Sequence, residues 1–281
     1  MPGKLEGKIA VVTGGNRGIG KGLALGLASE GARVAVITRS HVDEAEQVVQ
    51  RIKTLGSEGI VIKADVSKVR DVEAMAKQAV QHFGKIDILI NNSGIFDPMP
   101  FLQASEDIYD RIMATNAKGT FFCTQYVARV MIEKGTRGSI INLTSSQAAL
   151  GTPANMSAYT ASKGAIASLT RSLAGELARH GIRVNALMVG PTRTEGWNEQ
   201  PKVRPDLPGT GGEQMSQFLV PLLPVQRMGV PEDYVGIVNW LASDESTFAT
   251  AAIFVVDGGT TGVQSVPPEP AARSAAQGDG R

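Results

Sequence analysis

The sequence lacks several features that define whole classes of protein. Cys123 is its only cysteine, so no internal disulfide can form, which fits a reducing compartment. Apolar runs such as Ile9–Val12 and Ile86–Ile90 are far shorter than the roughly 20 residues that span a bilayer. The polar start, Met1–Lys8, has no signal-like apolar stretch. We therefore expect a cytoplasmic protein without membrane contact.

Charge excess and clustered metal ligands are also missing. Twenty-eight Lys and Arg residues against 27 Asp and Glu give a formal net charge of +1, which creates no overall field for nucleic acid. His41, His82 and His180 are scattered along the chain. A metal site needs several convergent ligands, so we expect no metal catalysis. Because the net charge is close to zero, we also expect no nucleic-acid binding.

What the chain does contain is a regular alternation of short β-branched segments and longer amphipathic ones. The strand candidates are almost continuously apolar, as expected when helices cover both faces of a parallel sheet. They are Ile9–Thr13, Arg33–Thr38, Ile60–Ala64, Ile86–Asn91, Ser139–Leu143, Arg183–Met188 and Ala252–Val256. The helix candidates are Gly20–Glu30, Val42–Leu55, Lys68–Phe83, Asp107–Lys134, Ala158–His180 and Pro231–Ser243. This order predicts one doubly wound, Rossmann-type α/β domain over residues 1–263, with a mostly parallel sheet of seven strands.

Two segments interrupt this alternation. Residues 195–224 are rich in proline and glycine and precede the last predicted helix, a position that favours a substrate lid over an ordinary surface excursion. Residues 264–281 have no periodicity and are rich in Pro, Ala, Gly and Gln, which indicates a disordered tail.

A glycine-rich turn, Thr13–Gly20 (TGGNRGIG), joins the first predicted strand to the first predicted helix. Free N–H groups and the positive dipole end at a helix N-terminus favour a phosphate, and glycine lets a pyrophosphate approach the backbone. The spacing differs by one residue from the G-x-G-x-x-G fingerprint. We predict a dinucleotide site here, contacted by Gly14, Asn16, Arg17, Gly18, Ile19 and Gly20.

The end of the second predicted strand favours NADP(H) over NAD. An NAD site usually places Asp or Glu there to bind the ribose 2′-hydroxyl, whereas this chain has Thr38, followed by Arg39 and Ser40. A guanidinium can pair with a 2′-phosphate that an acid would repel, and Arg17 can supply a second cation. The alternative is that both arginines are only solvated surface residues.

Polar residues at the ends of two further strands are expected to line the same cleft, because ligands bind outside the carboxyl ends of the strands. Asp65 can accept a hydrogen bond from the adenine amino group. The other candidates are Val66, Asn92, Ser93 and Gly94. Taken singly, each can instead be a helix or turn cap.

Tyr159 and Lys163 lie four positions apart at the start of a predicted helix, so their side chains share a face. A tyrosine with its ordinary pKa of about 10 is a poor acid–base catalyst at neutral pH. A nearby cation stabilises the phenolate and lowers that pKa. The pair alone is weak evidence, because such pairs occur on many exposed helices.

Taken together, these motifs resemble the short-chain dehydrogenase/reductase family over roughly residues 5–262, and its ketoreductases and 3-oxoacyl-carrier-protein reductase-like members in particular. The family's motifs occur in its usual order, with NNSG in place of NNAG and a serine 13 positions before the tyrosine. They are Thr13–Gly20, Asn91–Gly94, Asn116–Gly119 (NAKG), Ser146 and Tyr159–Lys163 (YxxxK).

The resemblance implies a role for each matched catalytic residue. Tyr159 would exchange a proton with the substrate oxygen, while Lys163 would bind the nicotinamide ribose and lower the pKa of Tyr159. Ser146 would hold the substrate oxygen, and its neighbour Ser145 is expected to point away. Asn116 would anchor a water that relays protons to Lys163.

The sequence departs from the family pattern after the sixth predicted strand. The usual Pro-Gly is Val189-Gly190 here, which could loosen the turn that seats the nicotinamide. Thr192 and Thr194 remain placed for the nicotinamide carboxamide. We expect both threonines at the cofactor.

These motifs predict an NADP(H)-dependent oxidoreductase that reversibly reduces a ketone or aldehyde, a small-molecule partner. One alternative is an NAD-linked alcohol or sugar dehydrogenase that works oxidatively. Another is a dinucleotide-sensing binding protein, although such proteins tend to lose the tyrosine or the lysine. Apolar residues near the expected pocket, Leu150, Met188, Trp197 and Met215, hint at a bulky substrate. The resemblance also implies a homo-oligomer, either a dimer or a tetramer.

Overall fold

The computed structural model describes residues 3–148, 155–196 and 212–263, and these contain one seven-stranded sheet in the order β3-β2-β1-β4-β5-β6-β7. Every neighbouring pair of strands is parallel. The strands are β1 (Ile9–Thr13), β2 (Arg33–Thr38), β3 (Gly59–Lys63), β4 (Ile88–Asn91), β5 (Ser139–Ser145), β6 (Arg183–Val189) and β7 (Ile253–Val256). The predicted doubly wound α/β fold is confirmed.

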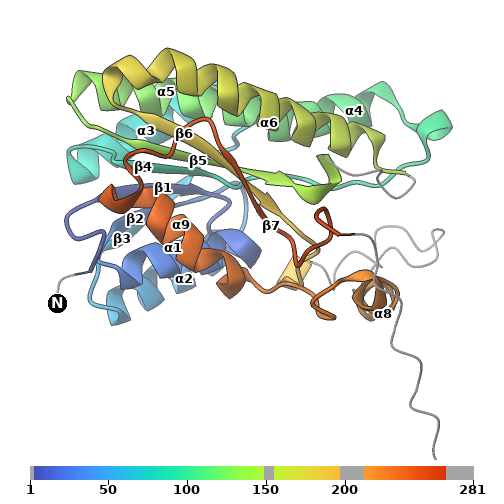
Figure 1. The fold of residues 1–281 in the computed structure, drawn as a ribbon. Helices are drawn as coiled ribbons and strands as arrows, with labels where there is room; N and C mark the ends of the chain where they lie inside the picture. The colour runs from blue at the N-terminus through green and yellow to red at the C-terminus, as the bar shows by residue number, and fades with distance from the viewer. Residues whose placement is uncertain (1–2, 149–154, 197–211, 264–281) are drawn as a thin grey trace, which may run out of the picture.

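Helices cover both faces of this sheet (Figure 1). One layer contains α1 (Gly18–Ser29), α2 (Val42–Thr54) and α9 (Val235–Ala242), and the other contains α3 (Val69–Phe83), α5 (Gly119–Glu133) and α6 (Ser157–Leu177). Alternate residues of one strand enter opposite layers, since Val12 packs with the first and Val11 with the second. Both faces of the strand are therefore apolar, and this explains its unbroken apolar run.

The predicted helix Asp107–Lys134 is divided in the structure. It consists of α4 (Glu106–Met113), a π-helical turn, η2 (Ala114–Lys118), and α5. A π turn adds one residue without interrupting the helical hydrogen bonding, so the sequence pattern of a continuous helix does not reveal it. This turn contains Asn116.

The predicted helix Pro231–Ser243 is also divided, because it begins with a 3₁₀ turn, η7 (Pro231–Tyr234), that leads into α9. The remaining short elements are η1 (Phe101–Gln103), η3 (Ser146–Ala148), η4 (Ala178–His180), α8 (Gly212–Leu219), η6 (Val220–Leu222) and η8 (Asp244–Ser246).

Only part of the predicted lid, and none of the predicted tail, falls within the described residues. The described part of the predicted lid contains α8 and η6. Residues 197–211 of the lid and residues 264–281 of the tail lie outside the described residues. In the described ranges, no helix combines the length and apolarity that crossing a membrane requires.

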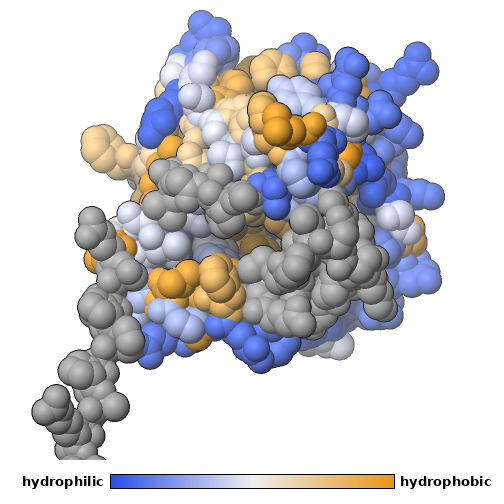
Figure 2. Space-filling model, turned by 90° about the vertical axis from the view of Figure 1, so that its right-hand side faces the viewer, coloured by the Kyte–Doolittle hydropathy of each residue, from blue (hydrophilic) through white to orange (hydrophobic). Residues whose placement is uncertain are grey.

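The chain order reverses between β1 and β4, which are neighbours at the middle of the sheet. Ligands of open α/β sheets bind outside the carboxyl ends of the strands at such a point. Seen from the side toward which the strands run, the surface is hollowed near its centre, with apolar side chains beside the hollow (Figure 2).

Candidate active site

A cleft of about 310 Å³ lies at the carboxyl ends of the strands on this side. Most of the predicted cofactor residues line it. They are Gly14, Asn16, Arg17, Gly18, Ile19, Thr38, Arg39, Ser40, Asp65, Val66, Asn92, Ser93, Gly94 and Thr194. Four further lining residues were not predicted, although each adjoins a predicted one in sequence: His41, Ala64, Ile95 and Thr115.

The glycine turn needs its glycines for two different reasons. Gly14 and Gly18 have φ values of +63° and +57°, in the left-handed region that side chains disfavour. A Cβ on Gly20 would lie 2.1 Å from the carbonyl oxygen of Gly14. Gly20 is therefore required for packing the turn against α1, and it is not among the residues that line the cleft.

Asn92 holds this turn against the end of β4. Its Nδ2 donates to the carbonyl oxygens of Thr13, at 2.9 Å, and Gly14, at 3.1 Å. The hydroxyl of Thr13 accepts from the backbone N–H groups of Asn92 and Ser93, both at 3.0 Å. These bonds fix the backbone that faces the cleft, so the side chain of Asn92 supports the turn.

At the end of β2 the cleft is lined by two arginines, and an acid of α2 lies nearby. Thr38 is buried and Arg39 is exposed, and Arg39 and Arg17 both line the cleft. The acid is Glu44 of α2, whose carboxylate accepts a 2.7 Å hydrogen bond from Nδ2 of Asn16.

The lining residues fit a dinucleotide. The positive N-terminal end of α1 and the two arginines suit phosphate groups. The carboxylate of Asp65 lies at the end of β3, where it accepts hydrogen bonds from the N–H and the hydroxyl of Ser67. Asp65 therefore caps a turn and also lines the cleft, so the turn cap and the predicted cofactor contact are compatible.

The cleft adjoins the predicted catalytic residues at Gly94. A Cβ there would lie 3.4 Å from Oδ1 of Asn116 and 3.6 Å from Nζ of Lys163, so a side chain would fill the space beside both groups. Lys163 is buried, and its Nζ donates to the carbonyl oxygen of Leu143 at 2.9 Å. Burial lowers the pKa of Lys163 to about 8.

The pKa of Tyr159 differs from the sequence-based expectation. Burial raises it, and a hydrogen bond with the side chain of Ser145 acts in the opposite direction. The Nζ of Lys163 is 5.8 Å from the centroid of the Tyr159 ring, with its own bond directed to Leu143. Desolvation of the phenol is the larger effect on this pKa in the structure, and the lowering of the pKa of Tyr159 by Lys163 stays a prediction. The ring of Phe96 packs edge-on against Tyr159 at 5.1 Å.

The side chain of Ser145 acts to lower the pKa of Tyr159, so Ser145 lies beside the tyrosine and does not point away from it as predicted. Strand alternation would place Ser146 on the face of Thr144, whose hydroxyl donates to the carbonyl oxygen of Lys163. The chain leaves the strand after Ser145 and turns into η3, so the alternation stops there. Ser146, buried at the start of η3, keeps its substrate-holding role only as a prediction.

Asn116 connects three segments of the site. Its Oδ1 accepts from the N–H of Ile95 at 2.8 Å, and its Nδ2 donates to the carbonyl oxygen of Ile95 and to the hydroxyl of Ser162, both at 3.0 Å. Ser162 in turn donates to the carbonyl oxygen of Tyr159 at 2.6 Å. The side chain of Asn116 thus positions the backbone around the tyrosine, and its water-anchoring role stays a prediction.

The two threonines after β6 face different ways. Thr194 lines the cleft, whereas Thr192 is buried and does not. The hydroxyl of Thr192 donates to the carbonyl oxygen of Gly190 at 2.8 Å and lies 2.5 Å from the hydroxyl of Tyr234. Thr192 therefore does not line the cleft while it contacts Tyr234, and its contact with the cofactor stays a prediction.

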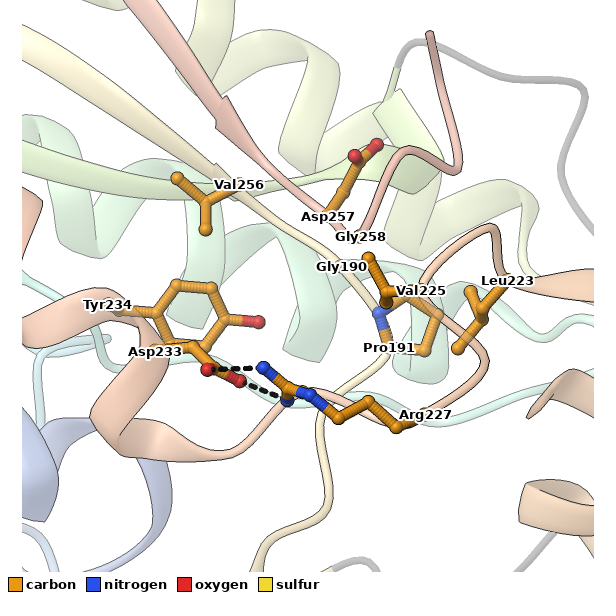
Figure 3. A pocket seen from close by; sticks show the side chains of 11 residues that line it. Gly190, Pro191, Leu223, Val225, Arg227, Asp233, Tyr234, Val256, Asp257 and Gly258 are labelled. Carbon is orange, nitrogen blue, oxygen red and sulfur yellow. Dashed lines mark hydrogen bonds and ion pairs between the residues drawn. The ribbon is translucent and has the colours of Figure 1, made fainter. Parts of the chain in front are cut away.

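Tyr234 borders a second, smaller pocket of about 190 Å³ behind the turn that follows β6 (Figure 3). The guanidinium of Arg227 spans both carboxylate oxygens of Asp233 there, at 2.7 and 2.8 Å. A Cβ on Gly190 would lie 2.5 Å from the Cα of Asp257. The turn can therefore approach the end of β7 this closely only with glycine at position 190.

Neither the cysteine nor a metal cluster offers a second reactive centre in the described residues. Cys123 is buried, and burial raises the pKa of its thiol to about 12, which leaves it un-ionised at neutral pH. The described ranges hold no group of three or more His, Cys, Asp or Glu residues arranged to bind a metal.

Known proteins match this chain over nearly their whole length. A family model described as Enoyl-(Acyl carrier protein) reductase matches residues 14–261. The chain is 36% identical to a hydroxynaphthalene reductase-like protein of Metarhizium acridum, with 92% of this chain and 97% of the relative covered. It is also 36% identical to the 2-dehydro-3-deoxy-D-gluconate 5-dehydrogenase of Escherichia coli (strain K12), with 91% and 96% covered. A crystal structure of a short-chain type dehydrogenase/reductase from Mycobacterium marinum superposes with a TM-score of 0.83 at 35% identity, covering 92% of this chain and 97% of that one.

Proposed function

This chain belongs to the short-chain dehydrogenase/reductase family, and we propose that it reduces a ketone or aldehyde with NADPH in a reversible reaction. As a member of the family it is an oxidoreductase that uses a nicotinamide dinucleotide. The observation that carries the proposal is the continuity of the two sites. Gly94 lines the cleft and lies directly beside Asn116 and Lys163. Lys163 follows Tyr159 by one turn of α6.

The bound cofactor would supply or accept the hydride, so the work of the protein is positioning and proton transfer. The hydroxyl of Tyr159 is the proposed proton donor in reduction and the acceptor in oxidation. Ser145, whose side chain acts to lower the pKa of Tyr159, is the residue that we propose holds the same substrate oxygen. Lys163, with a pKa lowered to about 8, can exchange its proton near neutral pH.

The proposed preference for NADP(H) rests on charge at the end of β2. Arg17 and Arg39 both line the cleft, and Thr38 stands where an acid would bind the ribose 2′-hydroxyl. Two acids oppose this charge: the carboxylate of Glu44 accepts a hydrogen bond from Asn16, and that of Asp65, which also lines the cleft, accepts hydrogen bonds from Ser67.

The direct test is oxidation of NADPH against a panel of ketones, aldehydes and quinones, with NADH run beside it. Turnover that prefers NADPH would support the proposal. Tight NADPH binding without turnover of any carbonyl would instead favour a dinucleotide-sensing protein.

One second candidate has a specific observation in its favour. The similarity to a 2-dehydro-3-deoxy-D-gluconate 5-dehydrogenase supports the oxidation of a sugar-like alcohol, the reaction of the NAD-linked alternative. The same assay run with NAD and NADP against sugar acids and polyols separates the two candidates. Reduction of NAD in preference to NADP would favour this second function.

A further inference from the structure

The N-terminus of α1 already carries an anion that belongs to the chain. Oε2 of Glu195 accepts a 2.9 Å hydrogen bond from the backbone N–H of Gly18. Its Oε1 lies 2.5 Å from Nζ of Lys21, one turn further along the same helix. Glu195 directly follows Thr194, which lines the cleft and whose Cγ2 would lie 3.3 Å from a Cβ on Gly18.

Glu195 is ionised in this position. Partial burial favours its neutral form, but the hydrogen bonds from Lys21 and from the backbone N–H groups of Glu195 and Gly18 outweigh that effect and lower its pKa. About half of its side-chain surface, 49%, remains exposed. The carboxylate can therefore leave the contact without crossing a closed interior.

The same N–H group is a natural partner for the diphosphate of a dinucleotide. Gly18 lines the cleft, and the N-terminus of the helix that follows a glycine turn favours a phosphate. One N–H cannot donate fully to two anions, and two anions within a few ångströms of each other repel strongly. A carboxylate and a diphosphate at this position therefore exclude each other.

We propose that Glu195 is an internal competitor for the cofactor diphosphate, so that cofactor binding displaces its carboxylate from Gly18 and from Lys21. This inference rests on the proposed function, because it requires that the cleft binds a dinucleotide. Glu195 then lowers the affinity for the cofactor, and Lys21 becomes available to the diphosphate once Glu195 has left.

The test compares the Glu195→Gln variant with the wild type in binding titrations. Glutamine keeps the shape and a hydrogen-bond acceptor but removes the charge. Glu213→Gln of α8 is the matched control, because it removes the same charge from an exposed neighbouring carboxylate whose partner is Arg193, at 4.0 Å. The ligands are NADPH, followed by its nicotinamide fluorescence, and adenosine 2′-monophosphate, which lacks the diphosphate.

We expect Glu195→Gln to tighten NADPH binding by about two- to tenfold, the range for one charge at a helix N-terminus. Binding of adenosine 2′-monophosphate should not change, and Glu213→Gln should leave both dissociation constants near those of the wild type.

An unchanged or weaker affinity of Glu195→Gln for NADPH would overturn the inference. So would an equal gain for adenosine 2′-monophosphate, which would reveal a general charge effect. If neither the wild type nor the variants bind NADPH or NADH, the proposed function fails as well. A wild type that binds NADPH with a dissociation constant equal to that of Glu195→Gln overturns the inference alone.

Discussion

At the scale of single residues, the proposed chemistry depends most on the hydroxyl of Tyr159. We expect Tyr159→Phe to reduce turnover by about 10²- to 10⁴-fold, the contribution of a positioned proton donor. NADPH binding should stay nearly unchanged, because the ring still packs against Phe96. Single-substrate kinetics together with NADPH titration check this, and full activity in the variant would contradict the assignment.

The choice between two neighbouring serines is a second prediction at this scale. We expect Ser145→Ala to lower kcat by about 10²-fold, because it removes a hydrogen-bond donor to the substrate oxygen. Ser146→Ala, at the start of η3, should cost much less. Parallel kcat and KM measurements on the two variants decide the question. The reverse order of effects would restore Ser146 to the role predicted from its spacing.

The cofactor preference is the third residue-scale prediction. Arg39→Asp should raise the ratio of the NADPH to the NADH dissociation constant by about ten- to a hundredfold, since a hydrogen-bonded charge is replaced by a repelling one. Fluorescence titration of both cofactors measures this ratio. If it does not move, Arg39 does not contact the 2′-phosphate.

At the scale of elements, the glycine turn and α1 depend on the close contact between Gly14 and Gly20. Gly20→Ala would place a Cβ 2.1 Å from the Gly14 oxygen and 2.4 Å from Nδ2 of Asn92. We expect this change to lower the free energy of unfolding by about 1–3 kcal/mol or more and to weaken cofactor binding.

Gly175→Ala in α6 is the matched control, because a Cβ there meets no atom within 4 Å. It should raise the free energy of unfolding by about 0.5–1 kcal/mol, as expected when glycine is replaced inside a helix. Urea unfolding of both variants measures whether each change lowers or raises the free energy of unfolding. Loss of stability in Gly175→Ala alone would contradict the packing argument.

At the scale of the whole molecule, we propose a dimer or tetramer formed through the long helices α5 and α6. Phe121 and Ile132 of α5 are 39% and 42% exposed, and apolar surface of this kind favours association. Light scattering should give two or four times the chain mass of 29.6 kDa. Phe121→Lys should lower that mass, and a monomeric wild type would sink the proposal.

The sequence by itself determined the fold and most of the cleft, because these depend on local patterns. Unbroken apolar runs such as Ile9–Thr13 identified strands that are covered on both faces. The glycine turn and the residues that follow each strand predicted most of the residues that line the cleft, because parallel strands bring their carboxyl ends to one edge. The spacing of Tyr159 and Lys163 put both on one face of α6.

Only the tertiary structure decided which side chains meet within the site. The chain leaves β5 after Ser145, and the side chain of Ser145 acts on the pKa of Tyr159, a contact that strand alternation did not predict. Tyr234 is hydrogen-bonded to Thr192, 42 positions away in the sequence, and Glu195 accepts a hydrogen bond from Gly18, 177 positions away. Such contacts follow from how the loops pack against the sheet. Local spacing carries no information about that packing, because many loop paths connect the same strands.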